Sequence, residues 1–303
     1  MRVFKVLLSL AAALFAVAAV GGETPATFER QVAADPKGIV EISSTSGTID
    51  VTGWDRAEVG VRAELGENVD RVEVTSEHGR TVIRVLLHSH TSIGLFSGHH
   101  ETHLHVKIPK GSELDVSTVS ADVTSDGVQG TQRLRTVSGE IAAEIGSADI
   151  EVKSVSGDVK LRGHGQPAHL HVSSVSGNVR LEHAAGDLEA TTVSGEISAA
   201  LDPAHSMRAR STSGDIRLEG RLTRGAEVDL QSVSGDVKLR GGSEEGFQYE
   251  VSSLSGDIGD CFNVEPERTS KYGPGHTLNG TQGAGSAHVR IKTMSGDIGL
   301  CDR

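Results

Sequence analysis

Aromatic residues are scarce in this chain of 303 residues, where they make up 3% of the sequence and include a single Trp. Large globular cores and most interfaces rely on such rings, because each buries a large apolar area. The scarcity therefore predicts a thin core built from aliphatic side chains. It also argues against a sugar-binding groove, in which aromatic rings usually stack on the sugar.

Basic residues are outnumbered, with 29 Lys and Arg against 41 Asp and Glu, and the formal net charge is −12. No basic stripe interrupts this acidic balance. Proteins that bind nucleic acid or anionic membrane surfaces normally cluster their positive charge. The sequence therefore excludes nucleic acid and anionic lipid surfaces from the expected partners.

Long hydrophobic runs are absent except at the N-terminus. Arg2 and Lys5 precede an apolar run over residues 6–20, which ends at Gly21-Gly22. A basic start, a short apolar core and small residues at the exit are typical of a secretory signal peptide, which we assign to residues 1–22; an uncleaved anchor is the alternative. The run is short for a membrane span. We therefore expect an exported chain, periplasmic, secreted or at the cell surface, with no membrane span in its mature form.

One short phrase is abundant and occurs in ten copies, the clearest being Ser154-Val155-Ser156-Gly157-Asp158-Val159. We call the residue before the Ser-Gly pair the anchor. Ser follows the anchor in all ten copies, and from Val119 to Leu254 successive anchors lie 18 to 21 residues apart. A fixed period near 20 is the signature of a repeat architecture. The anchors are Thr45, Val119, Val137, Val155, Val175, Val193, Thr212, Val233, Leu254 and Met294.

Two apolar columns flank the anchor. The residue three positions before it is apolar in every copy, and the residue four positions after it is β-branched in every copy. The alternation on both sides predicts two short strands joined by a bend at Ser-Gly. A single coil of this length cannot bury its own apolar face, whereas stacked coils can. We therefore predict an all-β β-solenoid whose anchor, −3 and +4 positions point inward; a β-sandwich is the alternative.

A different pattern fills the segment between anchors Thr45 and Val119, which lie 74 positions apart with no further copy of the phrase between them. Alternation around Val59, Val72, Ile83 and Leu104 predicts antiparallel strands joined by polar turns such as His78-Gly79. We expect this block to cover one end of the solenoid as a cap, since sheet edges need protection. The predicted organisation is a signal peptide at 1–22, an N-terminal β region with the first repeat copy at 23–115, and the repeat solenoid at 116–303.

The layout resembles the bacterial "putative adhesin" family of exported β-strand-repeat proteins. The resemblance covers essentially the whole mature chain and is carried by the Ser-Gly-Asp copies, the Gly53-Trp54-Asp55 turn and the Val106-Lys107-Ile108-Pro109-Lys110-Gly111-Ser112 entry into the repeats. It implies an adhesin-like role toward an envelope or surface component. The family has no assigned activity, so it supplies no catalytic residue.

An acidic residue stands three positions after the anchor in eight of the ten copies. Acid–base catalysis needs two carboxyls in different environments, whereas here every rung carries the same acid. The repetition favours a structural role, in which each carboxylate accepts backbone N–H groups at its bend. Binding of divalent cations along the column is the alternative. The acids are Asp122, Glu140, Asp158, Glu196, Asp215, Asp236, Asp257 and Asp297.

Histidines gather between residues 88 and 105, where six of the 14 occur. His88 and His90 share one face of a predicted strand, as do His103 and His105, and residues 91–98 form the expected hairpin loop between them. Four imidazoles on one face are a donor set for zinc, copper or nickel. The alternative is a solvated polar face.

The two cysteines, Cys261 and Cys301, each lie seven residues after an anchor and therefore share one register. Their anchors are 40 residues apart, so either a degenerate coil lies between them or residues 262–288 form an excursion and the two rungs touch. We favour the excursion, because the segment contains Gly-Pro-Gly at 273–275 and lacks the phrase. Adjacent rungs lie about 5 Å apart, within disulfide range, and export favours oxidation. We therefore predict a disulfide that fixes the last rung. Two free thiols or a metal pair are the alternatives.

Three functions follow from these patterns. The first is an exported, non-enzymatic scaffold that is adhesin-like or associated with the cell envelope. The second is a periplasmic metal-binding protein that uses the histidine segment. The third is a β-helix enzyme acting on polysaccharides. No Ser lies in a Gly-x-Ser-x-Gly elbow and the Gly-rich residues 280–285 include no Lys, so nucleophilic catalysis and phosphate binding are not predicted.

Overall fold

The structure is a computed structural model that describes residues 26–66, 69–87, 101–146, 148–260, 262, 264–268 and 274–301, without the side chain at 301. The predicted signal peptide, His88, His90 and Cys261 lie outside the described residues. Within those residues every regular element is a β-strand. No described segment therefore forms a helix long and apolar enough to cross a bilayer. The all-β prediction is confirmed.

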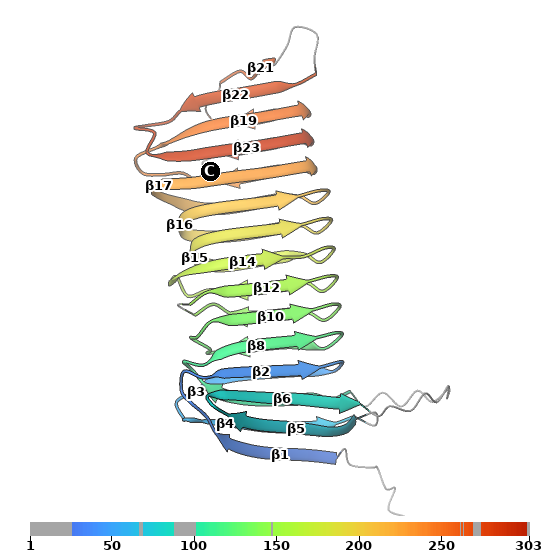
Figure 1. Cartoon of the computed structure of the whole chain (residues 1–303). Coiled ribbons are helices and arrows are strands. Elements are labelled where there is room, and N and C mark those ends of the chain that lie inside the picture. Colours follow the sequence, from blue (N-terminus) through green and yellow to red (C-terminus); the bar gives the residue numbers. More distant parts are fainter. Residues whose placement is uncertain are drawn as a thin grey trace, which may run out of the picture.

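The strands form one 24-stranded sheet that winds into a tall, solenoid-like stack (Figure 1). Each coil contributes a strand before the Ser-Gly bend and a strand after it. Strands before the bend form what we call the first face, and their neighbours are parallel and in register. The first face comprises β2 (Ile39–Ser44), β8 (Glu113–Thr118), β10 (Gln132–Thr136), β12 (Ile150–Ser154), β14 (Pro167–Ser173), the later parts of β15 (Val179–Thr192), β16 (Ile197–Ser211) and β17 (Ile216–Ser234), then β23 (Ala287–Ser295) and β19 (Phe247–Ser255).

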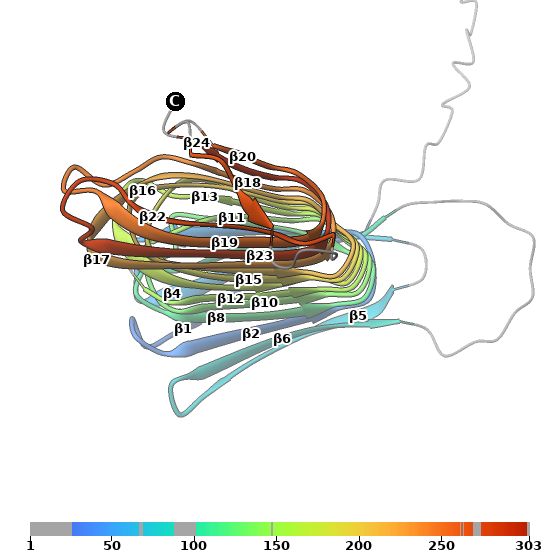
Figure 2. The same cartoon turned by 90° about the horizontal axis from the view of Figure 1, so that it is seen from above.

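Strands after the bend form the second face, which is again parallel and in register. Seen down the stack, the coils superpose and the bends lie together on one side (Figure 2). Aliphatic side chains between the faces make one continuous thin core. The second face comprises β3 (Thr48–Trp54), β9 (Asp122–Asp126), β11 (Ile141–Glu144), β13 (Val159–Arg162), the earlier parts of β15, β16 and β17, then β18 (Val237–Arg240), β24 (Ile298–Cys301) and β20 (Ile258–Asp260).

The last coil of the chain does not end the stack. β23 pairs with β17 on one side and with β19 on the other, and β24 likewise lies between β18 and β20. The predicted contact between the rungs of Leu254 and Met294 is confirmed. The expectation that the Met294 rung has no neighbour beyond it is wrong, because the excursion after β20 lets the chain return one rung below and insert there.

Antiparallel strands extend both faces at the N-terminal end. On the first face β6 (Arg80–Leu87) pairs parallel with β2 and antiparallel with β5 (Val69–Glu77). On the second face β7 (His103–Pro109) pairs parallel with β3 and antiparallel with β4 (Glu58–Leu65), which pairs with β1 (Ala26–Ala33). The four predicted strands around Val59, Val72, Ile83 and Leu104 are confirmed as β4 to β7. His78 and Gly79 both have positive φ, as the tight turn between β5 and β6 requires.

The few aromatic side chains gather near the two ends of the stack. At the C-terminal end Phe247, Tyr249 and Phe262 form a cluster with ring centroids 5.7 to 6.0 Å apart. Near it β19 is covered by the antiparallel β22 (His276–Thr281), which pairs with β21 (Glu267–Arg268). At the other end Trp54 donates a hydrogen bond from Nε1 to the Glu58 carbonyl. In the middle of the stack, the neighbouring rungs cover each coil, and the described core side chains there are aliphatic.

Candidate functional site

The Ser-Gly bends form one long edge of the stack, which we call the bend edge. The −3 and +4 residues are buried in every copy, as predicted. The anchors, however, are exposed: the eight Val, Leu and Met anchors retain 43 to 55% of their surface. The predicted inward anchor is therefore wrong. Strict alternation continues from −3 up to the bend, so that the residue at −1 points inward and the anchor points outward.

A small hydroxyl side chain occupies the inward −1 position in all ten copies. Ser154 donates to the Gly157 carbonyl, and the hydroxyls of Ser232 and Thr293 have no hydrogen-bond partner among the described residues. In five copies, however, the oxygen accepts a hydrogen bond from the backbone N–H three residues later, as in Gly139 to Thr136 (3.0 Å) and Gly214 to Ser211 (2.7 Å). This bond closes the bend from inside, where the core is too dry to leave an N–H unpaired. The Ser-or-Thr column at −1 was the signal that the sequence analysis missed, whereas the Ser after the anchor is exposed. The column is Ser44, Thr118, Thr136, Ser154, Ser174, Thr192, Ser211, Ser232, Ser253 and Thr293.

Aspartates of the acid column accept hydrogen bonds from the backbone of the neighbouring rung. The Oδ1 atom of Asp122 accepts the backbone N–H of Glu140 at 2.8 Å, one coil further along. Asp158, Asp215, Asp236 and Asp297 make the equivalent bond to the next rung in the stack. Asn178 makes it as well, so the bond requires an oxygen rather than a charge. This geometry supports the structural role predicted for these acids, although the acceptor joins neighbouring rungs rather than closing its own bend.

The two Glu in this column use their carboxylates differently. Glu140 is 2.8 Å from Lys160 Nζ, and Glu196 pairs with Arg217; each partner lies one rung along. The hydrogen bond that Lys160 donates to the Glu140 carboxylate raises the pKa of Lys160. The longer side chain reaches past the backbone N–H that Asp would accept.

On the outer side of the first face, the residues four positions before the anchor alternate in charge from Asp115 onward; the first copy departs from this pattern, because Glu41 lies opposite Asp115. Residues that lie opposite one another on neighbouring strands are acidic and basic in turn. His171, for example, lies between Glu151 and Glu189. Inserting the last coil preserves the pattern, because Arg290 lies between Asp229 and Glu250 and is 3.0 Å from the latter. In stack order the column reads Asp115, Arg133, Glu151, His171, Glu189, Arg208, Asp229, Arg290 and Glu250.

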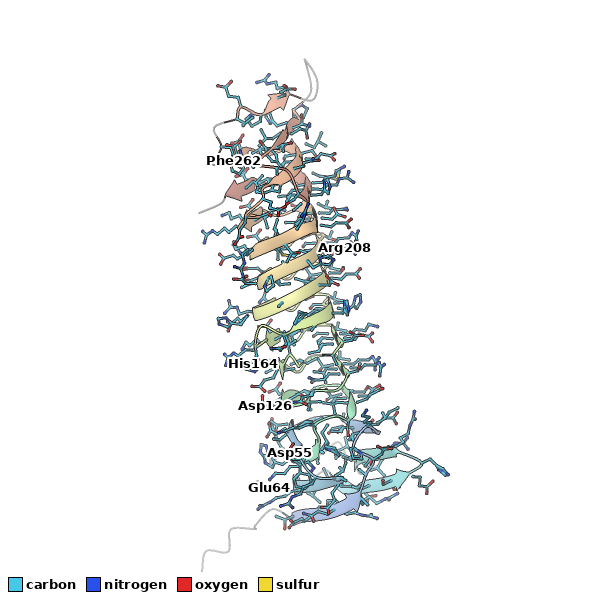
Figure 3. The ribbon with its side chains drawn as sticks, turned by 90° about the vertical axis from the view of Figure 1, so that its left-hand side faces the viewer. Asp55, Glu64, Asp126, His164, Arg208 and Phe262 are labelled. Carbon is cyan, nitrogen blue, oxygen red and sulfur yellow. The ribbon has the colours of Figure 1, made fainter. Side chains whose placement is uncertain are left out.

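A shallow groove of about 740 Å³ crosses the middle of this charged face. His169 and His171 lie in it on β14, and their Nδ1 atoms are 2.9 Å from Asp187 and 3.4 Å from Glu189 on β15. Arg208, seen pointing outward in Figure 3, lines the groove further along. The groove therefore presents both signs of charge to solvent. The sequence alone does not single out these histidines, because only the stack brings them beside the carboxylates of the next rung.

The edge opposite the bends has its own acidic group, at the end of β9 (Figure 3). Partial burial raises the pKa of Asp126, and the negative charges of Glu144 and Asp50 raise it further. Glu144 is also 3.5 Å from His164 and accepts the backbone N–H of Gly127. Within the described residues, no three His, Cys, Asp or Glu converge as a metal site would require.

The predicted histidine site is described in part. His103 and His105 share the outer face of β7, where Nδ1 of His103 is 2.8 Å from Thr48 Oγ1 and Nδ1 of His105 is 3.1 Å from Asp50. The predicted hairpin is wrong: β6 and β7 do not pair, because β6 belongs to the first face and β7 to the second. His88 and His90 follow β6 and lie outside the described residues.

The predicted disulfide is likewise described only in its backbone setting. β20 and β24 are parallel neighbours, with Asp260 opposite Leu300. In the sequence, the residue after each of these two is a cysteine. Cys261 and the Cys301 side chain lie outside the described residues, so the bond stays a prediction.

A family model described as Toastrack DUF4097 matches residues 39–300, from β2 to β24. No curated protein matches the chain. Among solved structures, the chain is similar to a "putative adhesin" from Parabacteroides distasonis ATCC 8503 (11% identity, 91% of this chain and 97% of that chain, TM-score 0.44). It is also similar to a "putative adhesin" from Bacteroides fragilis NCTC 9343 (10%, 92% and 100%, 0.41) and a "putative cell adhesion protein" from Clostridium sporogenes ATCC 15579 (9%, 92% and 100%, 0.29).

The matched region contains all ten phrase copies, so it takes in both faces and the whole bend edge. The resemblance inferred from the Ser-Gly-Asp copies is thereby confirmed. The chain belongs to the Toastrack DUF4097 family.

Proposed function

We propose that this protein is an exported, non-enzymatic, adhesin-like scaffold that binds a component of the cell envelope or surface along its first face. The observation that carries the proposal is the alternating charge column, which offers the same kind of contact on successive rungs. A long partner with regularly spaced charged groups fits such a surface better than a small substrate does. The groove around His169 and His171 gives the column a concave centre.

The assignment to a scaffold rests on how the repeat uses its polar groups. The aspartates accept backbone N–H groups and the buried hydroxyls close the bends. A catalytic pair needs two groups whose environments push their pKa values apart. The repeated groups have matched environments, which suits structure rather than acid–base chemistry. We also propose that the antiparallel strands β1, β4 and β5 cap the N-terminal end of the stack.

The test is cosedimentation of the mature protein with isolated cell walls and with envelope vesicles from the cells that export it. Replacing Arg133 and Arg208 by Ala should reduce binding at least tenfold, because both cations belong to the charged column. The matched control is Arg240→Ala, on the second face, where Arg240 pairs with Glu219. Equal binding by all variants would contradict the first-face assignment. Release of reducing ends from uronic-acid polymers would favour the polysaccharide-active alternative instead.

Export itself is tested at the N-terminus. Sequencing the mature protein from culture fractions should place its first residue between 19 and 23, since cleavage is predicted between Ala18 and Gly22. A protein that retains residues 1–22 in the membrane fraction would support an uncleaved anchor.

Metal binding is the second candidate function, and it is favoured by His105, whose Nδ1 is 3.1 Å from Asp50, with His103 on the same face of β7. Zn²⁺ or Cu²⁺ should then raise the melting temperature near pH 7 and lose its effect near pH 5, where the imidazoles are protonated. Replacing His88, His90, His103 and His105 by Ala should abolish the shift. The control replaces His169 and His171. A shift that survives the fourfold replacement would place any metal elsewhere.

A further inference from the structure

The exposed anchors form a row down the bend edge that is apolar in eight of the ten copies, with Thr45 at one end and Thr212 between Val193 and Val233. Each anchor carbonyl accepts the N–H of the Ser after the neighbouring anchor, from Thr45–Ser120 to Thr212–Ser234, at 2.8 to 2.9 Å. This register stacks Val119, Val137, Val155, Val175 and Val193 directly along one line. Ten rungs at about 4.8 Å make a row roughly 40 Å long. Soluble proteins rarely leave so long an apolar strip uncovered without a partner for it.

The two flanks of the row carry opposite charge. On the first-face side, two positions before the anchor, four of the ten residues are basic and none is acidic: Arg135, Lys153, Arg210 and Lys292. On the second-face side, three positions after the anchor, eight are acidic and none is basic. The row therefore has a basic margin and an acidic margin, and every basic residue shares its rung with an acid.

This arrangement is complementary to itself in one orientation only. When two rows face each other with the stacks parallel, around a two-fold axis along the stack, the basic margin of one copy meets the acidic margin of the other. The rungs then match, so that Arg135 faces Glu140 and Lys153 faces Asp158 of the partner subunit. With the stacks antiparallel, the two-fold axis brings basic margin to basic margin. Like charges across an interface are unfavourable, so the antiparallel pairing is disfavoured.

We propose that the bend edge is a self-association surface, through which two copies of the chain form a parallel, two-fold dimer. The interface is isologous, with each anchor meeting the same anchor near the axis. The basic residues now pair with exposed or half-buried acids on their own face: Arg135 with Asp115 at 3.0 Å, Lys153 with Glu151, Arg210 with Asp229 at 3.6 Å and Lys292 with Glu250 at 3.6 Å. Such exposed pairs contribute little and exchange easily for partners across the interface. The dimer leaves the charged column of the first face open, so it goes beyond the proposed function and does not depend on it.

Sedimentation equilibrium of the full mature chain tests the proposal directly. The parent protein should be a dimer, and Val155→Glu with Val193→Glu should raise its dissociation constant at least tenfold while the circular dichroism and melting temperature stay unchanged. The control adds the same two charges at exposed positions away from the row, as Gln129→Glu and Ala200→Glu. A monomeric parent, or equal weakening by the control, would overturn the proposal.

Cysteine cross-linking fixes the orientation. Val119 is second in the row from one end and Met294 second from the other. Val119→Cys should cross-link to itself with a short bismaleimide, and a mixture of Val119→Cys and Met294→Cys should give only like-with-like products. The parent protein, treated with the same reagent, measures the background cross-linking through Cys261 and Cys301. A predominant product joining Val119→Cys to Met294→Cys would show that the two stacks are antiparallel, which would contradict the parallel orientation inferred from the charged margins.

Discussion

The bend edge and the edge opposite it are built by the same coils but follow different rules. At the bend edge every copy uses the same phrase, and the rung-to-rung bonds recur at nearly constant length. At the opposite edge the connections differ in length, and the irregularities between β15 and β16 and between β16 and β17 fall there. The bend edge therefore sets the register, while the opposite edge absorbs the variation in coil length from 18 to 21 residues.

The largest expected effect is on stability, and it comes from comparing the same substitution at an inward and at an outward position beside the bend. Val179 is 1% exposed and Val175 is 44% exposed, although both are valines of the same coil. Val179→Asp buries an unpaired charge between the faces and should cost several kcal/mol, enough to unfold the protein. Val175→Asp should change the free energy of unfolding by less than about 1 kcal/mol. Urea denaturation of both variants measures this difference. Similar midpoints would contradict the assignment of Val179 to the core and Val175 to the surface.

That pair also shows how far the sequence could predict the fold. The strands, the stacking and the −3 and +4 columns follow from period and alternation alone. The anchor was misplaced because apolar character was weighed above alternation, and the inward hydroxyl at −1 was overlooked. The insertion of the last coil depends on contacts between segments 40 or more residues apart. The charge of Arg290, which fits only between Asp229 and Glu250, would have indicated it.

The next effect concerns the rungs at the C-terminal end, where the chain doubles back. A disulfide between Cys261 and Cys301 closes a loop of about 40 residues and should stabilise the fold by roughly 4 kcal/mol in the chain-entropy model. Mass spectrometry of unreduced, alkylated protein should find neither cysteine alkylated. Reduction should lower the melting temperature, and a Cys261→Ser, Cys301→Ser variant should match the reduced parent. Two alkylated cysteines in the unreduced protein would rule the bond out.

Glycine substitutions compare the two edges directly. At the bend edge, a Cβ on Gly157 would come within 1.8 Å of the Gly139 carbonyl oxygen in the neighbouring rung. Gly157→Ala should therefore force the rungs apart and cost about 2 to 3 kcal/mol. At the opposite edge, Gly165 has a φ of +75° and open space around its Cβ position. Gly165→Ala should cost only about 1 kcal/mol, from backbone strain. Equal costs would mean that close stacking at the bend is not what requires glycine there.

The smallest effect distinguishes an acceptor from a charge in the acid column. Asp158 Oδ1 accepts the N–H of Asn178 at 2.8 Å, and Asn178 Oδ1 accepts the N–H of Glu196 at 3.0 Å, so an amide already does this work one rung along. Asp158→Asn should keep the bond and leave the free energy of unfolding nearly unchanged. Asp158→Ala should lose about 1 kcal/mol, the usual net value of such a bond.

The melting temperatures of the parent, Asp158→Asn and Asp158→Ala proteins, measured with and without Ca²⁺, test the cation-binding alternative. If the column binds cations, the parent is stabilised by Ca²⁺ and the Asn variant loses that gain. If the column only joins rungs, Ca²⁺ has no differential effect and the order of stability is Asp, Asn, then Ala.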